Sequence, residues 1–319
     1  MKRIALSVLL LISTFAEAQT YPNKPIRWIV PYTGGGITDV VTRVVTQKMS
    51  GAIGQPIVVD NKPGANSILG SDLAAKAPAD GYTMVTVIAG YAANVTLYQG
   101  KLPFDPLKDL VPVSLAGIAP LIMTVNPSLP AKDVKELIAY AKANPGKLNF
   151  GSSGIGAAAH LTCELFKQTV GIDMVHIPFK GTAPAMQAAM ANDIQILVDT
   201  PLSLVPQVRA GKLRGLGMFS AARLPAYPDV PTIVENGGPP IESSTWVMFM
   251  APGNTPKEIV ARLAGEVGKA INESEIKQKF SDLGVEPVGN SPEAAKKFLD
   301  TEIAKWKKVI DTAGVKAEQ

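Results

Sequence analysis

The chain has 319 residues, of which 46% are hydrophobic and 18% are charged, and its formal net charge at pH 7 is +4. The basic residues are scattered along the sequence instead of clustered, which argues against nucleic acid as a partner. The single cysteine, Cys163, excludes an internal disulfide bond. Because Cys163 falls in the apolar pattern of an expected helix, we expect a buried small side chain and not a nucleophile.

The first 18 residues have the three parts of a secretory signal peptide. A basic head at residues 1–3 is followed by the apolar run "IALSVLLLISTF" and by a small-x-small cleavage site that ends at Ala18. This run is too short to span a bilayer, which needs about 20 residues. We therefore expect cleavage near Ala18 and export to the periplasm, with an uncleaved N-terminal anchor as the alternative. No cysteine directly follows the cleavage site, so lipid attachment there is not expected. We also expect no direct lipid binding.

The mature chain begins with strands and helices in βαβαβ order. The clearest helix covers residues 37–53, where apolar side chains recur at helical spacing and fall on one face. In chain order we expect a strand at 26–30, this helix, a strand at 56–60, a short helix at 67–77 and a strand at 82–89. Such an alternation is typical of a parallel sheet covered by helices.

A second series with the same alternation follows, but its sequence does not repeat the first. We expect strands at 121–126, 148–150, 174–179, 194–200 and 213–219, separated by helices at 131–143, 157–170, 183–192 and 204–211. An apolar stretch at 245–252 precedes three helical patterns, at 256–271, 273–282 and 292–312. This order predicts an α/β protein of two lobes with a cleft between them, where small ligands usually bind. Without the signal peptide about 300 residues remain, enough for two domains of roughly 150.

Each series contains a glycine-rich loop between an early strand and the helix that follows. We call "PYTGGGITD" (residues 31–39) the first glycine loop and "GSSGIGAAAH" (residues 151–160) the second glycine loop. Exposed N–H groups and the positive end of the helix dipole make a helix N-terminus an anion site, and glycine lets the backbone approach the anion closely. Hydroxyls that can donate to a carboxylate are those of Thr33, Thr38, Ser152 and Ser153. Two such loops in two lobes could hold one anion from both sides.

The second glycine loop also contains most of the dinucleotide-binding pattern G-x-G-x-x-[GA], in Gly154, Gly156 and Ala159. That use requires an acidic residue at the end of the next strand, about 20 positions further on. The one candidate, Asp173, precedes the expected strand at 174–179. The sequence therefore argues against a nicotinamide cofactor, and we expect no cofactor.

Enzymatic uses of the loops have little support. The only two histidines, His160 and His176, have no partners at metal-ligand spacing, so we expect no metal site. Ser153 is not in the G-x-S-x-G pattern of a serine nucleophile. His160 could reach the loop from one helical turn on, but we expect it to pack inside its helix face. Asp39 either contacts ligand or ties down the first glycine loop; we expect the structural role, since a carboxylate would repel a carboxylate ligand.

Seven ordered blocks of the mature chain resemble the Bug receptors, the extracytoplasmic substrate-binding proteins of tripartite tricarboxylate transporters. The resemblance covers essentially the full mature length, and its blocks are "YPNKPI" with "PYTGGGITD", "VVDNKPGANSILGSDLAAKAPADGYT", "LPFDPLKDLVPVSL", "NPGKLNFGSSGIGAAAHL", "HIPFKGTAPAMQAAMANDIQILVD", "GKLRGLGMFSAARLPAYPDVPTIVE" and "WVMFMAPGNTP". It implies a type II periplasmic-binding-protein fold, whose two α/β lobes close on a carboxylate solute without catalysis. It also implies integral-membrane transporter subunits as partners, and we expect a monomer.

The resemblance implies that both glycine loops hold the ligand carboxylate, partly through ordered water. Carried over by position, the ligand-binding residues are Tyr32, Thr33, Gly34, Gly35, Gly36 and Thr38 in the first glycine loop, and Ser152, Ser153, Gly154, Gly156 and Ala157 in the second. Family members often have a hydroxyl residue in place of Ala157, so a water or a backbone N–H is expected to replace that donor. The distal part of the pocket is expected to include Asn66, Ser67, Tyr91, Phe179, Lys180, Gly181, Asp199 and Thr200.

With this fold we expect lobe 1 to comprise residues 19–121 and 242–319, and lobe 2 residues 122–241. The hinge is expected near residues 120–123 and 242–246. Two alternatives remain for the output: a receptor that presents its ligand to a sensor kinase, and an exported enzyme that uses the glycine loops as an anion site. We expect the solute to be an aliphatic or aromatic mono-, di- or tricarboxylate, acidic amino acids included, and the sequence does not choose among these.

Overall fold

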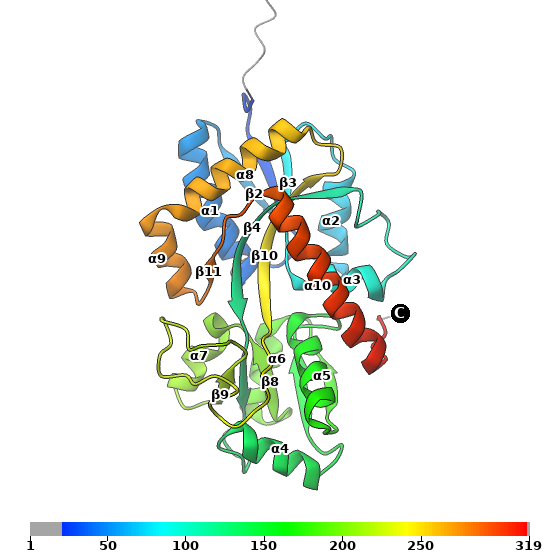
Figure 1. The fold of residues 1–319 in the computed structure, drawn as a ribbon, viewed down its shortest axis with the longest axis vertical. Coiled ribbons are helices and arrows are strands. Elements are labelled where there is room, and N and C mark those ends of the chain that lie inside the picture. Colours follow the sequence, from blue (N-terminus) through cyan, green and yellow to red (C-terminus); the bar gives the residue numbers. More distant parts are fainter. Residues whose placement is uncertain (1–20, 318–319) are drawn as a thin grey trace, which may run out of the picture.

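The computed structural model describes residues 21–317, so the expected signal peptide lies outside the described residues. Within that range, strands form a six-stranded sheet in the order β11-β4-β10-β3-β1-β2 and a five-stranded sheet in the order β7-β6-β8-β5-β9. The two sheets lie one above the other, each with helices around it (Figure 1). We call the first sheet with α1–α3 and α8–α10 lobe 1, and the second sheet with α4–α7 lobe 2. The predicted α/β fold of two lobes is confirmed.

The sheet of lobe 1 has a parallel and an antiparallel part. β1 (Ile26–Val30) lies between β2 (Ile57–Asn61) and β3 (Thr83–Val87) and is parallel to both. β10 (Ser244–Pro252) is antiparallel to β3 and to β4 (Leu110–Pro120). The predicted βαβαβ unit is therefore confirmed, and the antiparallel part is an addition to it.

The sequence pattern predicts neither β4 nor α3 (Ala89–Leu97), which the structure adds to lobe 1. β4 contains Pro112 and Gly117, which weaken a strand prediction. Pro112 is accommodated next to a register shift in the pairing of β4 with β10. α3 follows β3 after the single residue Ile88, so its apolar pattern merges with that of the strand. A short β11 (Glu286–Pro287), also not predicted, pairs with β4.

The sheet of lobe 2 has the same mixed construction. β6 (Asn149–Ser152) is parallel to β7 (Val175–Pro178) and to β8 (Ile196–Asp199). β5 (Ile122–Val125) is antiparallel to β8 and to β9 (Arg214–Met218). All five strands overlap predicted strands, although the pattern does not give their directions.

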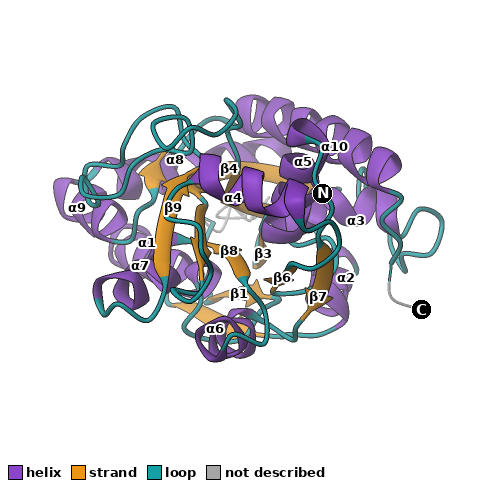
Figure 2. Ribbon diagram, turned by 90° about the horizontal axis from the view of Figure 1, so that it is seen from below, coloured by secondary structure: helices purple, strands orange, loops and turns teal. Residues whose placement is uncertain are grey.

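Apart from α3, the helices follow the predicted order. In lobe 1 they are α1 (Ile37–Ile53), the 3-10 helix η1 (Ala65–Ser67) that leads into α2 (Ile68–Ala75), α3, α8 (Lys257–Asn272), α9 (Ser274–Asp282) and α10 (Pro292–Ala313). In lobe 2 they are α4 (Val134–Ala143), α5 (Ala158–Val170), α6 (Thr182–Ala191) and α7 (Pro201–Arg209). Strands of both sheets lie inside this layer of helices (Figure 2).

The C-terminal helix α10 contacts both lobes. It packs against α3 and β4 of lobe 1 and also against α5 of lobe 2 (Figure 1). The Gln168 side chain of α5 donates to the Val309 carbonyl at 3.4 Å. Glu302 of α10 is buried and accepts the indole N–H groups of Trp246 and Trp306 at 2.9 and 3.0 Å. One hydrophobic cluster therefore includes side chains from both lobes.

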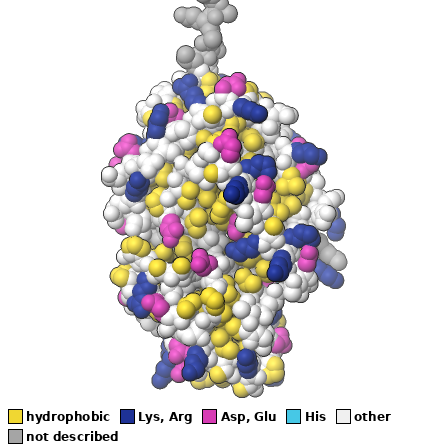
Figure 3. Space-filling model, viewed as in Figure 1, with side chains coloured by type: hydrophobic (Ala, Val, Ile, Leu, Met, Phe, Trp, Pro, Cys, Tyr) yellow, Lys and Arg dark blue, Asp and Glu magenta, His cyan; other side chains and the backbone are white. Residues whose placement is uncertain are grey.

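Burial and surface charge agree with the sequence. Cys163 is fully buried, as predicted, and burial raises the pKa of its thiol. On the face in Figure 3, basic and acidic side chains are interspersed. None of the helices in residues 21–317 has the length and apolarity needed to cross a membrane.

Candidate functional site

The carboxyl ends of the parallel strands of the two sheets face one another. β1, β2 and β3 lead into α1, η1 and α3, and β6, β7 and β8 lead into α5, α6 and α7. These edges meet, because Asn66 Nδ2 donates to the Ile155 carbonyl at 3.2 Å, and a Cβ on Gly156 would lie 2.5 Å from Leu97 Cδ1. Helix N-termini of both lobes thus converge at the lobe boundary, at the strand ends where α/β proteins usually bind ligands.

The first glycine loop has exposed glycines and an open helix N-terminus. Residues 33–36 are exposed, and α1 begins after Gly36 without a side-chain cap. The first N–H groups of α1 are therefore available to an anion. Tyr32 is partly buried and Thr38 is buried. Burial raises the pKa of the Tyr32 hydroxyl, despite a hydrogen bond with Ser67.

Asp39 fixes the first glycine loop from the first turn of α1. Its carboxylate accepts the Gly35 N–H at 3.0 Å and the Asn61 amide at 3.0 Å, and Asn61 also donates to the Tyr32 carbonyl. Arg43, one turn further on, donates to the same carboxylate at 2.9 Å. Burial alone would raise the pKa of Asp39, but the hydrogen bonds from Arg43, Gly35 and Asn61 outweigh it and hold that pKa below its usual value. Both carboxylate oxygens are thus engaged inside the protein.

The second glycine loop uses several of its own N–H groups internally. Ser152 Oγ accepts the Gly154 N–H at 3.2 Å, and the Gly154 carbonyl accepts the Ala157 N–H at 3.2 Å. His160 Nδ1 accepts the Gly156 N–H at 3.1 Å. Gly154 and Gly156 have φ angles of +141° and +79°, which residues with a Cβ rarely adopt. These N–H groups shape the loop and are not free for a ligand.

Two kinds of hydrogen-bond donor in the second glycine loop remain available to a ligand. α5 begins at Ala158 without a side-chain cap, so its first N–H groups are available. The Ser153 hydroxyl has no partner among the described residues, and Ser153 is only partly buried. Ser152, in contrast, is fully buried and donates to the Gly154 carbonyl at 2.9 Å. The geometry therefore favours Ser153 for side-chain contact with a ligand and Ser152 for support of the loop.

Both histidines lie against the second glycine loop as a stacked pair. The His160 and His176 rings have centroids 3.7 Å apart and planes 9° apart. His160 is buried, as predicted. The contact of His176 Nε2 with Ser152 Oγ, at 2.7 Å, does not follow from the sequence pattern. One signal for it is the buried Met174, which lies two residues earlier, directly before β7.

The segment before α2 contacts the second glycine loop across the lobe boundary. Ala65, Asn66 and Ser67 have positive φ angles of 46°, 51° and 69°, an uncommon geometry for residues other than glycine. Asn66 Nδ2 donates to Asn94 Oδ1 at 2.7 Å as well as to the Ile155 carbonyl. Asn94 donates in return to the Asn66 carbonyl at 2.9 Å. This pair of amides holds the left-handed segment against lobe 2.

The expected distal residues after β7 border the second glycine loop. The Phe179 N–H donates to the Ser152 carbonyl at 3.0 Å, and the Gly181 N–H donates to the Ser153 carbonyl at 3.2 Å. Lys180, between them, is exposed. Phe179, Lys180 and Gly181 are therefore brought together with the loop.

Three other expected distal residues have their polar groups occupied inside the protein. Asp199 accepts from the Thr182 hydroxyl at 2.8 Å and from the Thr200 N–H at 2.7 Å. Burial nevertheless raises the pKa of Asp199 above its usual value. Tyr91 is buried in lobe 1, and its hydroxyl donates to the Pro106 carbonyl at 2.7 Å. These side chains support the strand and helix ends around the site.

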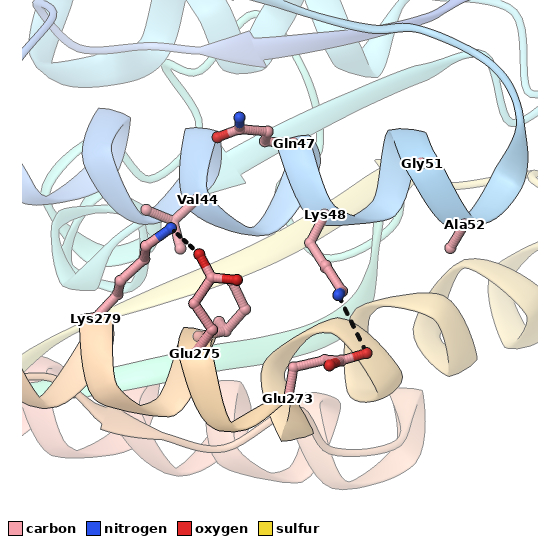
Figure 4. A pocket seen from close by; sticks show the side chains of 9 residues that line it. Val44, Gln47, Lys48, Gly51, Ala52, Glu273, Glu275 and Lys279 are labelled. Atoms are coloured by element: carbon pink, nitrogen blue, oxygen red, sulfur yellow. Dashed lines mark hydrogen bonds and ion pairs between the residues drawn. The ribbon is translucent and has the colours of Figure 1, made fainter.

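Two surface pockets lie apart from the glycine loops. One, of about 500 Å³, lies between α1 and α9, where Lys48 pairs with Glu273 at 3.3 Å and Lys279 with Glu275 at 2.7 Å (Figure 4). Another, of about 440 Å³, is lined by residues within 220–242. Neither includes a residue of the glycine loops. Within residues 21–317, no group of three or more His, Cys, Asp or Glu side chains could hold a metal ion.

Comparison with known proteins relates nearly the whole chain to one family. Residues 41–315 match the family model described as the tripartite tricarboxylate transporter family receptor. The chain is 35% identical to protein BugT of Bordetella pertussis over 307 residues, which cover 96% of this chain and 94% of BugT. It is similar to a solved R. palustris protein with adipate, at 34% identity and a TM-score of 0.86, over 93% of this chain and 99% of that one. It is also similar to MatC from Rhodopseudomonas palustris with bound malate, at 32% identity and a TM-score of 0.81, over 91% and 100% of the two chains.

Proposed function

Because the chain belongs to the family of tripartite tricarboxylate transporter receptors, we propose that it captures an organic carboxylate between its lobes and delivers it to a membrane transporter of the tripartite tricarboxylate type. The observation that carries this proposal is that α1 and α5, in different lobes, both begin without a side-chain cap, at strand ends that meet across the lobe boundary through the hydrogen bond of Asn66 with Ile155. The similar R. palustris proteins with adipate and with malate support a carboxylate as the ligand. The proposed activity is binding, without a reaction on the solute.

In this proposal the carboxylate lies between the two glycine loops. On one side it accepts hydrogen bonds from the first N–H groups of α1 and from the Thr33 hydroxyl. On the other side it accepts from the first N–H groups of α5 and from the Ser153 hydroxyl, partly through ordered water. The other proposed loop residues shape the backbone around it: Tyr32, Gly34, Gly35, Gly36, Thr38, Ser152, Gly154, Gly156 and Ala157. The rest of the solute extends toward Asn66, Ser67, Phe179, Lys180 and Gly181.

We further propose that the lobes close around the solute by a hinge motion. The hinge lies where the chain passes between the sheets, at Leu121 and Ser243, which are joined by a hydrogen bond from the Leu121 N–H to the Ser243 carbonyl at 3.1 Å. Lobe 1 then comprises residues 19–121 and 242–319, and lobe 2 residues 122–241. The mature protein acts as a periplasmic monomer, and its membrane partner is a protein.

A thermal-shift screen of the mature protein, residues 19–319, tests the proposal. The protein is first freed of co-purified ligand by unfolding and refolding, and then mixed with adipate, malate, citrate and aromatic acids. Amides and alcohols of the same carbon skeletons are the matched controls. A ligand at 100 times its Kd adds about 2.7 kcal/mol to the free energy of unfolding, which raises the melting temperature by a few degrees. Shifts from carboxylates alone support the proposal; no shift from any carboxylate, or equal shifts from the amides, contradicts it.

A further inference from the structure

The stacked histidine pair has no role in the proposed binding, yet each ring contacts a polar group of the second glycine loop. His160 is 3% exposed, and its Nδ1 lies 3.1 Å from the Gly156 nitrogen. His176 stacks on His160 and also on Phe150, with ring centroids 4.9 Å apart in the latter pair. Its Nε2 lies 2.7 Å from Ser152 Oγ. The pair is therefore built into the loop and not merely buried beside it.

The contact with Gly156 sets the protonation state of His160. A backbone N–H can only donate, so His160 Nδ1 must be an unprotonated acceptor and the neutral ring carries its proton on Nε2. A second proton, on Nδ1, would place two donors 3.1 Å apart and break the contact. Burial, assisted by the charges of His176 and Lys167, lowers the pKa of His160 to about 3.

The charged groups around the pair also leave it neutral. On α5, Glu164 Oε1 lies 4.0 Å from His160 Nε2, and Lys167 pairs with Glu164 at 3.0 Å. From β7, His176 faces His160, and burial together with Lys167 lowers the pKa of His176 to about 4. The Ser152 hydroxyl donates to a backbone carbonyl, which leaves His176 Nε2–H as the donor to Ser152 Oγ. No neighbour thus compels a proton onto His160 Nδ1.

The Gly156 N–H belongs to the same peptide unit as the Ile155 carbonyl, which accepts from Asn66 of lobe 1. Because the peptide is planar and trans, its N–H and C=O point in opposite directions. Fixing the N–H on His160 therefore aims the carbonyl away from His160. In the structure the Ile155 carbonyl oxygen lies 3.2 Å from Asn66 Nδ2. A rotation of this peptide would break the hydrogen bond within lobe 2 and the hydrogen bond between the lobes together.

We propose that neutral His160 is a positioning residue for lobe closure: by accepting the Gly156 N–H it directs the Ile155 carbonyl to Asn66. The closed form in which the ligand is held then depends on a side chain that does not touch the ligand. The ligand part of this inference rests on the proposed carboxylate function. The peptide orientation does not, because it is a property of the protein alone.

Two substitutions of His160 distinguish its role as a hydrogen-bond acceptor from its role as a stacked aromatic ring. His160→Phe keeps an aromatic ring for stacking on His176 but removes the acceptor, whereas His160→Asn restores an amide oxygen near the position of Nδ1. The readouts are the affinities for adipate and malate by calorimetry and the exchange rate of the Gly156 amide by NMR. His160→Phe should weaken binding about tenfold, since a buried hydrogen bond and the contact that it orients are lost. The Gly156 amide should exchange at least about tenfold faster, and His160→Asn should restore both to within about threefold.

A double-variant cycle with Asn66→Ala tests the link between the lobes. If His160 acts through the Ile155 carbonyl, His160→Phe should change affinity less than about twofold when Asn66 is already Ala. Additive losses in this cycle overturn the proposal. So does a His160→Asn protein that melts like the wild type but binds as weakly as His160→Phe.

If the wild type binds neither adipate nor malate, that result counts against the carboxylate function. The positioning role of His160 can still be measured in the protein without ligand. Nitrogen-15 spectra of the histidine rings at pH 7 should then show unprotonated Nδ1 and protonated Nε2 for His160. A proton on His160 Nδ1, or a Gly156 amide that exchanges equally fast in the wild type and in His160→Phe, refutes the positioning role.

Discussion

The first glycine loop is held by an ionised carboxylate, whereas the second is held by neutral imidazoles. Asp39 accepts from the Gly35 backbone and from Arg43 and Asn61. His160 accepts from the Gly156 backbone while buried in a ring stack. Both side chains lie in the first turn of the helix that follows the loop. The same task, fixing a glycine N–H from that turn, is thus done by two different chemistries.

The comparison teaches how an anion site is stiffened without repelling the anion. A carboxylate next to the α1 N-terminus would oppose an anionic ligand, but Arg43 and two further donors occupy the oxygens of Asp39. At α5, neutral imidazoles add no charge of either sign. In both lobes the positive end of the helix dipole is therefore left to act on the ligand.

The loops also differ in the space around their glycines, and this gives the largest expected effect. Gly156 has φ +79°, and a Cβ there would lie 2.5 Å from Leu97 Cδ1. Gly36 has φ −76° and no atom within 4 Å of a Cβ. Gly156→Ala should lower the free energy of unfolding by about 3 kcal/mol, from the left-handed backbone and the displaced Leu97. Gly36→Ala, the matched control, should stay within about 0.5 kcal/mol. Urea unfolding without ligand measures both, and equal losses would erase the contrast between the loops.

Removing the carboxylate of the first glycine loop should have the next largest effect. Asp39→Ala leaves the Gly35 N–H without its acceptor and removes one of the two acceptors of the Asn61 amide. Hydrogen bonds to charged groups are worth more than neutral ones, so we expect a loss of about 2 kcal/mol in the free energy of unfolding. Arg43→Ala, which removes only the exposed partner, should cost less than about 1 kcal/mol. An Asp39→Ala protein as stable as Arg43→Ala would show that the carboxylate does not fix the loop.

Local patterns predict the elements that carry the loops. α1 spans Ile37–Ile53, the range given by its apolar periodicity, and the glycines before α1 and α5 mark where each helix begins. β4 and α3 escape prediction because proline and glycine interrupt the one and a strand directly precedes the other. β4 and α3 form because of pairing with β10 and of packing, and neither can be seen in a short stretch of the sequence.

Among the side chains that support the two loops, some can likewise be predicted from the sequence and others cannot. Asp39 is one turn from the glycines that it fixes, so its structural role can be predicted from spacing. His176 reaches Ser152 only because β6 and β7 pair in parallel with Phe150 opposite His176. The contact of Asn66 with Ile155 joins residues from different lobes. Such contacts follow from the tertiary structure and leave no periodic signal in the sequence.

Acid should act on the second glycine loop before the first. The histidine pKa values are about 3 for His160 and about 4 for His176, below the ordinary 6.5, so the unfolded chain binds more protons below pH 6.5. The free energy of unfolding should therefore fall as pH falls from 6.5 toward 4, by about 1 kcal/mol per histidine between pH 6.5 and 5.5. Asp39, with its pKa lowered, keeps its contribution above its ordinary pKa and loses it only as pH falls through the lowered value.

The chain has only these two histidines, so a double variant isolates their contribution. His160→Asn combined with His176→Gln should show a nearly flat free energy of unfolding between pH 6.5 and 5.5, measured in urea. The wild type should slope downward toward acid over the same interval. An equal slope in both proteins would assign the acid sensitivity to groups outside the second glycine loop.

The smallest expected effect concerns a contact between lobes that involves neither loop. The Tyr227 hydroxyl donates to the Asp282 carbonyl at 3.1 Å, from lobe 2 to the end of α9. Tyr227→Phe should weaken carboxylate binding only about twofold, since one partly buried hydrogen bond between the lobes is lost. Tyr21→Phe removes a hydroxyl-to-carbonyl bond of the same type within lobe 1, to Gly81, and should leave affinity unchanged. If Tyr227→Phe instead weakened binding as much as His160→Phe does, closure would depend on the whole lobe boundary and not chiefly on the loop contacts.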